Sequence, residues 1–349
     1  MANRSLGVAV IGAGMVGRAH ANAYRQAGTV YGPGLPDIRL AAIADTYEPF
    51  AAETARRFGY QRSETSWQAV AEASDVDVVS VAVANSLHRE VVEGLLAAGK
   101  HVLCEKPLAP TVADGEAMVA AAERSDRVAA IGLTFRRAPA INALREQVTD
   151  GVLGPVSHFN GHYWCDYGFD PDAPISWRYR GGPGTGALAD IGSHLVDLGE
   201  FFCGPLRTVG GAVGTFSVSR IAYGHPNKLA FEVFCERGAA EFDLDRAAEF
   251  TIADGTPPGP VNGYRQVLVG PAHPYVVGGL PMDFPGVGHG QNDFFVYQAR
   301  AFLEQVAGLG GLPPAPSLAE GLHYLRVLEA VAASARAGGA AVPIGGETP

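Results

Sequence analysis

The sequence predicts an α/β fold in which a doubly wound parallel sheet is followed by an α+β domain with a large, mostly antiparallel open sheet. Residues 1–132 alternate between short β-branched runs and helical segments, as parallel sheets with crossover helices do. Residues 133–349 contain several strand-like runs separated by loops rich in Pro and Gly. We therefore expect two domains, which the length of 349 residues also favours.

The composition excludes several classes of protein. Hydrophobic residues make up 47% of the chain, which argues against disorder. The formal net charge is −10 with no basic stripe, so no nucleic acid and no anionic membrane is expected as a partner. The sequence has no signal-peptide pattern and no apolar run long enough to cross a bilayer. The four cysteines are scattered, which favours free thiols and a cytoplasmic location.

A glycine motif follows the first expected strand, residues 6–11, and opens a helix over residues 18–27. Gly12 permits a tight turn, Gly14 lets a pyrophosphate approach the backbone, and Gly17 lets the helix pack closely on the strand. The free N–H groups and the dipole at the helix start favour the anion. The stretch predicts a Rossmann dinucleotide site, and the residues expected to contact the cofactor along this turn are Gly12, Gly14, Met15, Val16 and Gly17.

The second expected strand, residues 38–44, ends in Asp45. A carboxylate there accepts hydrogen bonds from the adenosine ribose hydroxyls and repels a 2′-phosphate. The following residues, Thr46, Tyr47 and Glu48, supply no cation for such a phosphate. We therefore expect NAD rather than NADP, with an ordinary solvated loop carboxylate as the alternative interpretation.

The remaining elements of the first domain continue the alternation. Strands are expected at residues 76–83, 101–104 and 128–133, and helices at residues 49–58, 67–73, 89–98 and 112–124. Ligands bind at the carboxyl ends of the strands in such sheets. The polar or glycine residues expected at that edge are Gly12, Asp45, Asn85 and Lys106.

Lys106 has two interpretations. Just after a buried strand and followed by Pro107, it is suited to hold a substrate hydroxyl and to lower the pKa of a neighbouring acid–base group. The alternative is a surface lysine paired with Glu105.

The second domain opens with a helix over residues 138–150 and a strand over residues 156–164. His158 and His162 share one face of that strand, together with Asn160 and Trp164. Because residues four apart on a strand are separated by about 13 Å, the two histidines cannot share one ion, and no metal site is predicted.

An apolar helix over residues 186–198 places Asp190 and His194 one turn apart. A histidine influenced by a carboxylate is a good general base near neutral pH, whereas the alternative is a structural Asp–His pair in the core. The later elements are four strands interpreted as antiparallel and two helices. They are expected at residues 208–218, 228–235, 239–244 and 250–252, and at residues 292–307 and 317–338.

Three motifs resemble those of the glucose–fructose oxidoreductase / inositol dehydrogenase / MocA (Gfo/Idh/MocA) family over nearly the whole chain. They are Gly12-x-Gly14-x-x-Gly17, Glu105-Lys106-Pro107 and Asp190-Ile191-Gly192-Ser193-His194. The resemblance implies a Rossmann domain that carries NAD(P). It also implies a second domain that shapes the substrate pocket and mediates assembly into a homo-oligomer, a dimer or tetramer.

The same resemblance implies that Lys106, Asp190 and His194 form the catalytic group. His194 would take the hydroxyl proton as hydride leaves the same carbon for the nicotinamide. Asp190 would orient substrate and histidine, and Lys106 would polarise the hydroxyl or the product carbonyl. The implied activity is NAD-dependent oxidation of a secondary hydroxyl of a sugar, anhydrosugar or cyclitol.

Further stretches resemble levoglucosan dehydrogenase-like sugar dehydrogenases, among them Phe135-Arg136-Arg137, Tyr163 to Tyr167 and Pro174 to Arg178. This likeness implies a fuller set of site residues. For the cofactor these are Val83, Asn85, His88, Glu105, Lys106, Trp177 and Arg178, and for the substrate they are Lys106, Phe135, Arg136, Cys165, Tyr167, Asp190 and His194.

The sequence also departs from that pattern. Val83-Ala84-Asn85 replaces the usual Thr-Pro-Asn, Phe135 replaces an aromatic hydroxyl, and Cys165 stands where relatives tend to carry Gln, so substrate hydrogen bonding must differ. Strand material that relatives carry is absent between Phe216 and Ser217, and two interpretations stay open: a shorter sheet, or a segment omitted from the sequence. Three other activities stay open: a keto-sugar reductase, an NAD-dependent glycosidase, and a dinucleotide-binding sensor without catalysis.

Overall fold

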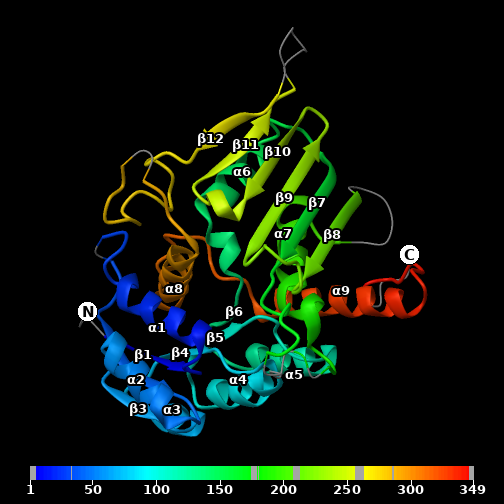
Figure 1. The fold of residues 1–349 in the computed structure, drawn as a ribbon. Coiled ribbons are helices and arrows are strands. Elements are labelled where there is room, and N and C mark those ends of the chain that lie inside the picture. The colour runs from blue at the N-terminus through cyan, green and yellow to red at the C-terminus, as the bar shows by residue number, and fades with distance from the viewer. Residues whose placement is uncertain are drawn as a thin grey trace. The chain divides into compact units, whose positions relative to one another are not determined.

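A computed structural model describes residues 5–32, 34–173, 179, 181–206, 213–255, 263–284 and 287–345. By internal packing the chain divides into two units (Figure 1). Unit 1 comprises Met1–Thr134, Val277–Asp283 and Asn292–Leu322, and unit 2 comprises Phe135–Val276, Phe284–Gln291 and His323–Pro349. The division expected from the sequence assigned everything after residue 132 to the second domain, whereas packing groups two later segments with the first unit.

The sheet of unit 1 has six parallel strands in the order β3-β2-β1-β4-β5-β6, which confirms the predicted open parallel sheet. The strands are β1 (Leu6–Ile11), β2 (Ile38–Ala44), β3 (Arg62–Glu64), β4 (Val78–Val81), β5 (His101–Glu105) and β6 (Ala129–Gly132). The strand order reverses between β1 and β4, which is where such sheets bind ligands. The edge strand β3 was not expected, because its short polar sequence lacks an apolar pattern.

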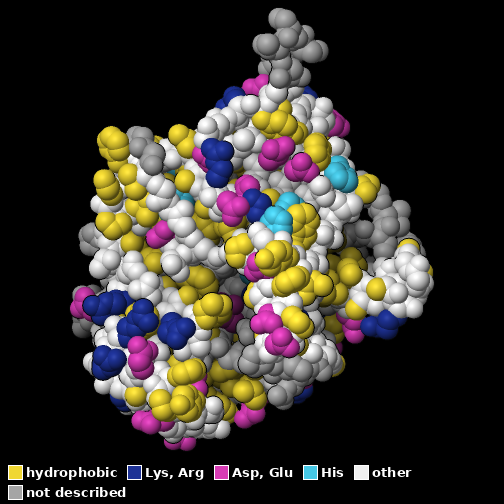
Figure 2. Space-filling model, in the orientation of Figure 1, with side chains coloured by type: hydrophobic (Ala, Val, Ile, Leu, Met, Phe, Trp, Pro, Cys, Tyr) yellow, Lys and Arg dark blue, Asp and Glu magenta, His cyan; other side chains and the backbone are white. Residues whose placement is uncertain are grey.

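Helices follow the strands of unit 1 almost as predicted. They are α1 (Met15–Ala27), α2 (Glu48–Phe58), α3 (Trp67–Glu72), α4 (His88–Ala97) and α5 (Val112–Glu123). On the face drawn in Figure 2, Lys and Arg side chains gather over the part of unit 1 that carries α1 and α2, with Asp and Glu side chains among them. None of the described helices is long and apolar enough to span a membrane.

Helix α8 (Gln291–Ala307) contributes to the core of unit 1 from late in the chain. Its Phe302 and Leu303 belong to the same buried cluster as Val8 of β1 and Tyr24 of α1. An amphipathic helix was expected here, but its membership of the first unit was not.

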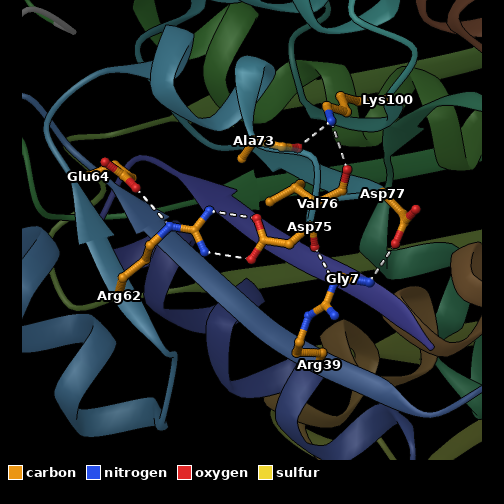
Figure 3. A network of polar contacts seen from close by, with 9 residues as sticks. All are labelled: Gly7, Arg39, Arg62, Glu64, Ala73, Asp75, Val76, Asp77 and Lys100. Carbon is orange, nitrogen blue, oxygen red and sulfur yellow. Dashed lines mark hydrogen bonds and ion pairs between the residues drawn. The ribbon is translucent and has the colours of Figure 1, made fainter.

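A polar network joins the segments at the amino ends of the parallel strands (Figure 3). The Arg62 guanidinium binds Asp75 through two hydrogen bonds, Nη1 to Oδ2 at 2.7 Å and Nη2 to Oδ1 at 2.9 Å. Lys100 Nζ donates to the carbonyl oxygens of Ala73 and Val76 at 2.7 and 2.9 Å. This edge lies at the opposite end of the strands from the expected ligand edge, so we assign the network to stability.

Arg62→Met should destabilise unit 1 in a pH-dependent way. The hydrogen bond from Arg62 lowers the pKa of Asp75, so the pair stabilises the fold above the unfolded Asp pKa of about 3.9 and ceases to do so as pH falls through the folded pKa. Because the two side chains are 32% and 37% exposed, the effect is about 1 kcal/mol or less, a Tm decrease of about 2–4 °C. Thermal denaturation at pH 7 and below pH 4 measures it.

The difference in Tm between wild type and Arg62→Met should shrink at the lower pH. Arg56→Met is the control: this exposed arginine of α2 has no ion pair among the described residues, and its loss should leave Tm unchanged. A Tm difference that stays constant with pH would contradict the assigned role of Asp75.

The sheet of unit 2 has six strands in the order β12-β11-β10-β9-β7-β8. They are β7 (Val156–Trp164), β8 (Val213–Ser219), β9 (Lys228–Cys235), β10 (Gly238–Asp243), β11 (Glu249–Ala253) and β12 (Arg265–Leu268). The sheet is mostly antiparallel, as predicted, but β8 runs parallel to β7. The expectation that residues 208–218 pair antiparallel is therefore wrong for its described part. The connection from β7 to β8 contains α7 (Ser193–Cys203), and such a helical crossover is the usual link between parallel strands.

Strand β12 lies between the last expected strand, residues 250–252, and the helix expected from residue 292, in a stretch for which no strand was predicted. Phe216 and Ser217 lie in the middle of β8, opposite Gly161 and His162 of β7, and the missing strand material expected between them stays a prediction. The helices outside the crossover are α6 (Pro139–Thr149) and α9 (Leu318–Arg336), of which the part up to Leu322 belongs to unit 1.

Candidate functional site

The glycine turn after β1 leaves room for a ligand at one position only. Gly12 has a φ of +97°, and a Cβ there would lie 2.4 Å from the carbonyl oxygen of Ala82. A Cβ on Gly17 would lie 1.6 Å from the carbonyl oxygen of Gly12. In contrast, no protein atom lies within 4 Å of a Cβ built on Gly14. Two of the glycines are thus required by the fold itself, whereas Gly14 faces open space where a pyrophosphate fits.

The start of α1 presents backbone donors at this turn. The N-cap residue is Gly14, no side chain caps the helix, and the side chain of Met15 is 75% exposed. The N–H groups of the first turn have no partner within the helix and are suited to bind phosphate oxygens. Val16 is half-buried beside them.

Asp45 joins the ends of β1 and β2. Its Oδ2 accepts a hydrogen bond from the N–H of Ala13 at 2.7 Å, and its Oδ1 accepts one from the N–H of Tyr47 at 2.9 Å. Each carboxylate oxygen has a second lone pair, so these bonds leave acceptor capacity for ribose hydroxyls. Asp45 therefore has both the position and the chemistry expected of the NAD-selecting carboxylate.

Replacing Asp45 with Ser and Thr46 with Arg should shift cofactor preference towards NADP by about tenfold or more, because the repelling carboxylate is exchanged for a cation that accepts the 2′-phosphate. Titration of the variant with NADH and NADPH, followed by nicotinamide fluorescence, measures the ratio. Thr46→Arg alone is the control, and an unchanged ratio in the double variant would remove Asp45 from the ribose site.

His88 connects the segments that follow β4 and β5. Its Nδ1 lies 3.1 Å from the carbonyl oxygens of Pro107 and Leu108, and its Nε2 lies 3.2 Å from that of Val83. Burial lowers the pKa of the imidazole. The ring supports the half-buried Val83 and the Lys106 turn, and the cofactor contact expected of His88 stays a prediction. Asn85 is buried in the same connection.

Glu105 is anchored inside unit 1. Its Oε1 lies 2.8 Å from Nε2 of His20, and its Oε2 accepts a hydrogen bond from the N–H of Lys106 at 3.2 Å. The Lys106–Pro107 peptide bond is cis, and Lys106 is half-buried. Sequence reasoning missed His20. Its position three residues after Gly17, on the sheet-facing side of α1, is the available signal.

In unit 2, Asp190 and His194 lie where a turn of π-helix, Leu188–Gly192, leads into α7. Wide turns of this kind are frequent at functional sites. Aromatic rings surround His194: its ring centroid is 4.8 Å from that of Phe135, in edge-on geometry, and 5.8 Å from that of Tyr163. His194 is only 7% exposed, so these rings restrict its orientation.

Two donors meet on one oxygen of Asp190. Tyr167 donates its hydroxyl proton to Oδ2 at 2.7 Å, and Arg220 Nη1 lies 3.3 Å from the same atom. Burial and the neighbouring carboxylate raise the pKa of Tyr167, so its hydroxyl stays protonated and remains a donor. Arg220 was not predicted. The signal that could have revealed it is its place directly after a strand that ends beside β7.

The other expected site residues have mixed placements. Arg136 donates through Nε to Oδ1 of Asp197 at 2.7 Å, so its charge is already paired inside unit 2. The buried Cys165 continues the β7–β8 pairing, because its N–H donates to the carbonyl oxygen of Ser219 at 2.8 Å. Trp177 and Arg178 lie outside the described residues.

Family models match a segment of each unit. Residues 6–133 match the model of the oxidoreductase family with an NAD-binding Rossmann fold, and residues 141–211 match the GFO/IDH/MocA C-terminal domain. Levoglucosan dehydrogenase of Pseudarthrobacter phenanthrenivorans is 30% identical over 382 positions, covering 95% of this chain and 96% of the relative. D-glucoside 3-dehydrogenase of Escherichia coli is 33% identical over 58% of this chain and 56% of its own length.

Among solved structures, levoglucosan dehydrogenase in complex with NADH and L-sorbose has a TM-score of 0.90 and 30% identity, covering 98% of this chain and 99% of that chain. Similarity of this extent covers both units and the motifs that first pointed to the family. The chain belongs to the Gfo/Idh/MocA oxidoreductase family, and its first unit is the family's NAD-binding Rossmann fold.

Proposed function

We propose that the protein is a dehydrogenase that uses NAD to oxidise a secondary hydroxyl of a sugar, anhydrosugar or cyclitol. The observation that carries the proposal is the pairing of Asp190 with Tyr167 and Arg220 one helical turn from the ring-bounded His194. Such a set holds a carboxylate and an imidazole in fixed orientations, which acid–base chemistry requires. The relatives that act on levoglucosan and D-glucosides support a sugar as substrate.

The proposed chemistry divides between cofactor and chain. The glycine turn and Asp45 would hold NAD, which would supply the acceptor for the hydride of the substrate carbon. His194 takes the proton of the substrate hydroxyl, so that a carbonyl is left on that carbon. Asp190 orients the hydroxyl and the imidazole, and Lys106 polarises the oxygen with its positive charge.

Substrate contacts are proposed for the residues around the acid–base pair. Tyr167, which is 47% exposed, would contact the substrate, and the buried Phe135 and Cys165 would shape the pocket from behind, Phe135 by packing against Tyr163. Arg136 would act through Asp197 rather than as a direct contact, because its guanidinium is already engaged. Trp177 and Arg178 remain proposed neighbours of the nicotinamide.

We also propose that the chain assembles as a dimer or tetramer and acts in the cytoplasm. The free thiol state of all four cysteines supports a reducing compartment. Sedimentation equilibrium of the purified protein tests the assembly, and a monomer at micromolar concentration would contradict it.

The first experiment is NADH formation at alkaline pH, which favours oxidation because the reaction releases a proton. NAD and NADP are each offered with inositols, aldoses, levoglucosan and alkyl glucosides. Turnover with NAD and one polyol class is the expected result. Bound NAD without turnover across the panel would contradict the proposal. NADH consumption with a keto-sugar would then identify a reductase.

A further inference from the structure

Arg220 is brought to Asp190 by the parallel pairing of β7 and β8. Trp164 and Ser219 are the last residues of these strands and lie opposite each other. The segments that follow β7 and β8 therefore leave the sheet at the same edge. Main-chain bonds continue past the strands, with the N–H of Gly168 donating to the carbonyl oxygen of Arg220 at 2.8 Å. The backbone of Arg220 is thereby tied to the segment that carries Tyr167.

The side chain of Arg220 is held in a confined environment. It is 7% exposed, and its Cζ lies 4.6 Å from the centre of the Tyr179 ring. A buried guanidinium requires a counter-charge, because an unpaired charge is costly to remove from water. Asp190, itself 20% exposed, supplies that charge at 3.3 Å.

We propose that Arg220 is a positioning residue for catalysis, which keeps Asp190 ionised and oriented so that its Oδ2 accepts the Tyr167 hydroxyl. This inference rests on the proposed dehydrogenase function. It extends that function by assigning the charge state of Asp190 to a residue outside the three family motifs.

The described groups around Asp190 comprise two tyrosines, a histidine and Arg220. Tyr167 faces it from the segment after β7, and Tyr163 from β7 itself, where burial, Cys165 and Asp190 raise the tyrosine pKa. His194 lies one turn further along α7. Because the pKa values of Tyr163 and Tyr167 are raised, both hydroxyls are neutral. Of these described neighbours, Arg220 is therefore the group that brings a permanent positive charge, which favours the carboxylate over the acid.

The test begins with the titration of Asp190 in the full chain. Carbon-13 labelling of aspartate carboxyl groups gives a resonance that is assigned to Asp190 by its loss in Asp190→Asn. In Arg220→Met the midpoint should rise by about one pH unit or more, because a cation within about 4–6 Å normally lowers it by that amount. Arg220→Lys, which keeps the charge, should recover most of the wild-type midpoint.

Kinetics of the same variants supply the second measurement. In Arg220→Met, kcat/KM at neutral pH should fall by about tenfold, and its acidic limb should move to higher pH with the Asp190 midpoint. The Kd for NADH should not change. Tyr167→Phe is the matched control. It removes the other donor to Oδ2 and should leave Asp190 ionised by Arg220.

The outcomes separate the two claims. An Asp190 midpoint that is the same in wild type and Arg220→Met would overturn the inference, whatever the kinetics show. Failure of the wild-type protein to oxidise any sugar would overturn the proposed function, while the titration still tests Arg220. If Arg220→Met does not fold, Arg220→Gln is compared with Arg220→Lys, and equal midpoints would again overturn the inference.

Discussion

His194→Ala should lower kcat for sugar oxidation by about 10²–10⁴-fold while the Kd for NADH stays near that of the wild type. The imidazole is the proposed acceptor of the hydroxyl proton, and no other described imidazole lies on the same helix. The expected dinucleotide contacts at the glycine turn and Asp45 do not include His194, so they should be unchanged in the variant. Stopped-flow turnover and fluorescence titration measure the two quantities separately.

Two further variants sharpen this expectation. Lys106→Ala should lower kcat to a similar extent, because the charge that polarises the substrate oxygen is lost. His162→Ala is the control: this histidine lies on β7, stacked on Trp164, away from the Asp190 pair, and its loss should not affect kcat. Normal turnover in His194→Ala would refute the assigned mechanism.

The second large effect concerns the glycine turn, where one Gly→Ala substitution should weaken NADH binding and another should destabilise the fold. Gly14→Ala places a methyl group in space that is free of protein atoms, so Tm should stay near wild type. NADH affinity should nevertheless fall by about tenfold or more, because the methyl group occupies the approach of the pyrophosphate. Gly17→Ala should instead destabilise the fold by about 1–3 kcal/mol, since its Cβ would lie 1.6 Å from the Gly12 carbonyl oxygen.

Calorimetry with and without NADH distinguishes the two variants. Gly14→Ala should unfold at the wild-type temperature without NADH but gain little from its addition. Gly17→Ala should unfold at a lower temperature in both conditions. If Gly14→Ala bound NADH normally, the open space beside this residue would not be the pyrophosphate site.

The parallel half of the fold was predictable because its strands are buried on both faces. Residues 6–11 are continuously apolar and all six are buried, so the local pattern was sufficient. Strand β3 was not predicted because Arg62-Ser63-Glu64 pairs only at the sheet edge and has no apolar pattern. The direction of β8 was predicted wrongly because the local alternation of a strand does not determine whether it pairs parallel or antiparallel.

The site shows the same division between local and distant information. Gly12, Asp45 and Lys106 follow directly after strands, so the parallel topology was enough to place them at one edge of unit 1. Arg220 lies 30 residues from Asp190, and only the pairing of β7 with β8 brings the two together. The engagement of Arg136 by Asp197 likewise depends on tertiary packing, 61 residues apart.

The late position of α8 has a consequence for how the protein is made. The nucleotide-binding unit begins at the amino terminus, yet Phe302 and Leu303 of its core are synthesised after nearly all of unit 2. During translation the strands β7 to β12 are therefore already complete before Tyr24 can pack against Phe302 and Leu303. The core of the first unit is thus completed only after α8 has been made, and truncation shortly after residue 134 would leave it with an unfilled apolar surface.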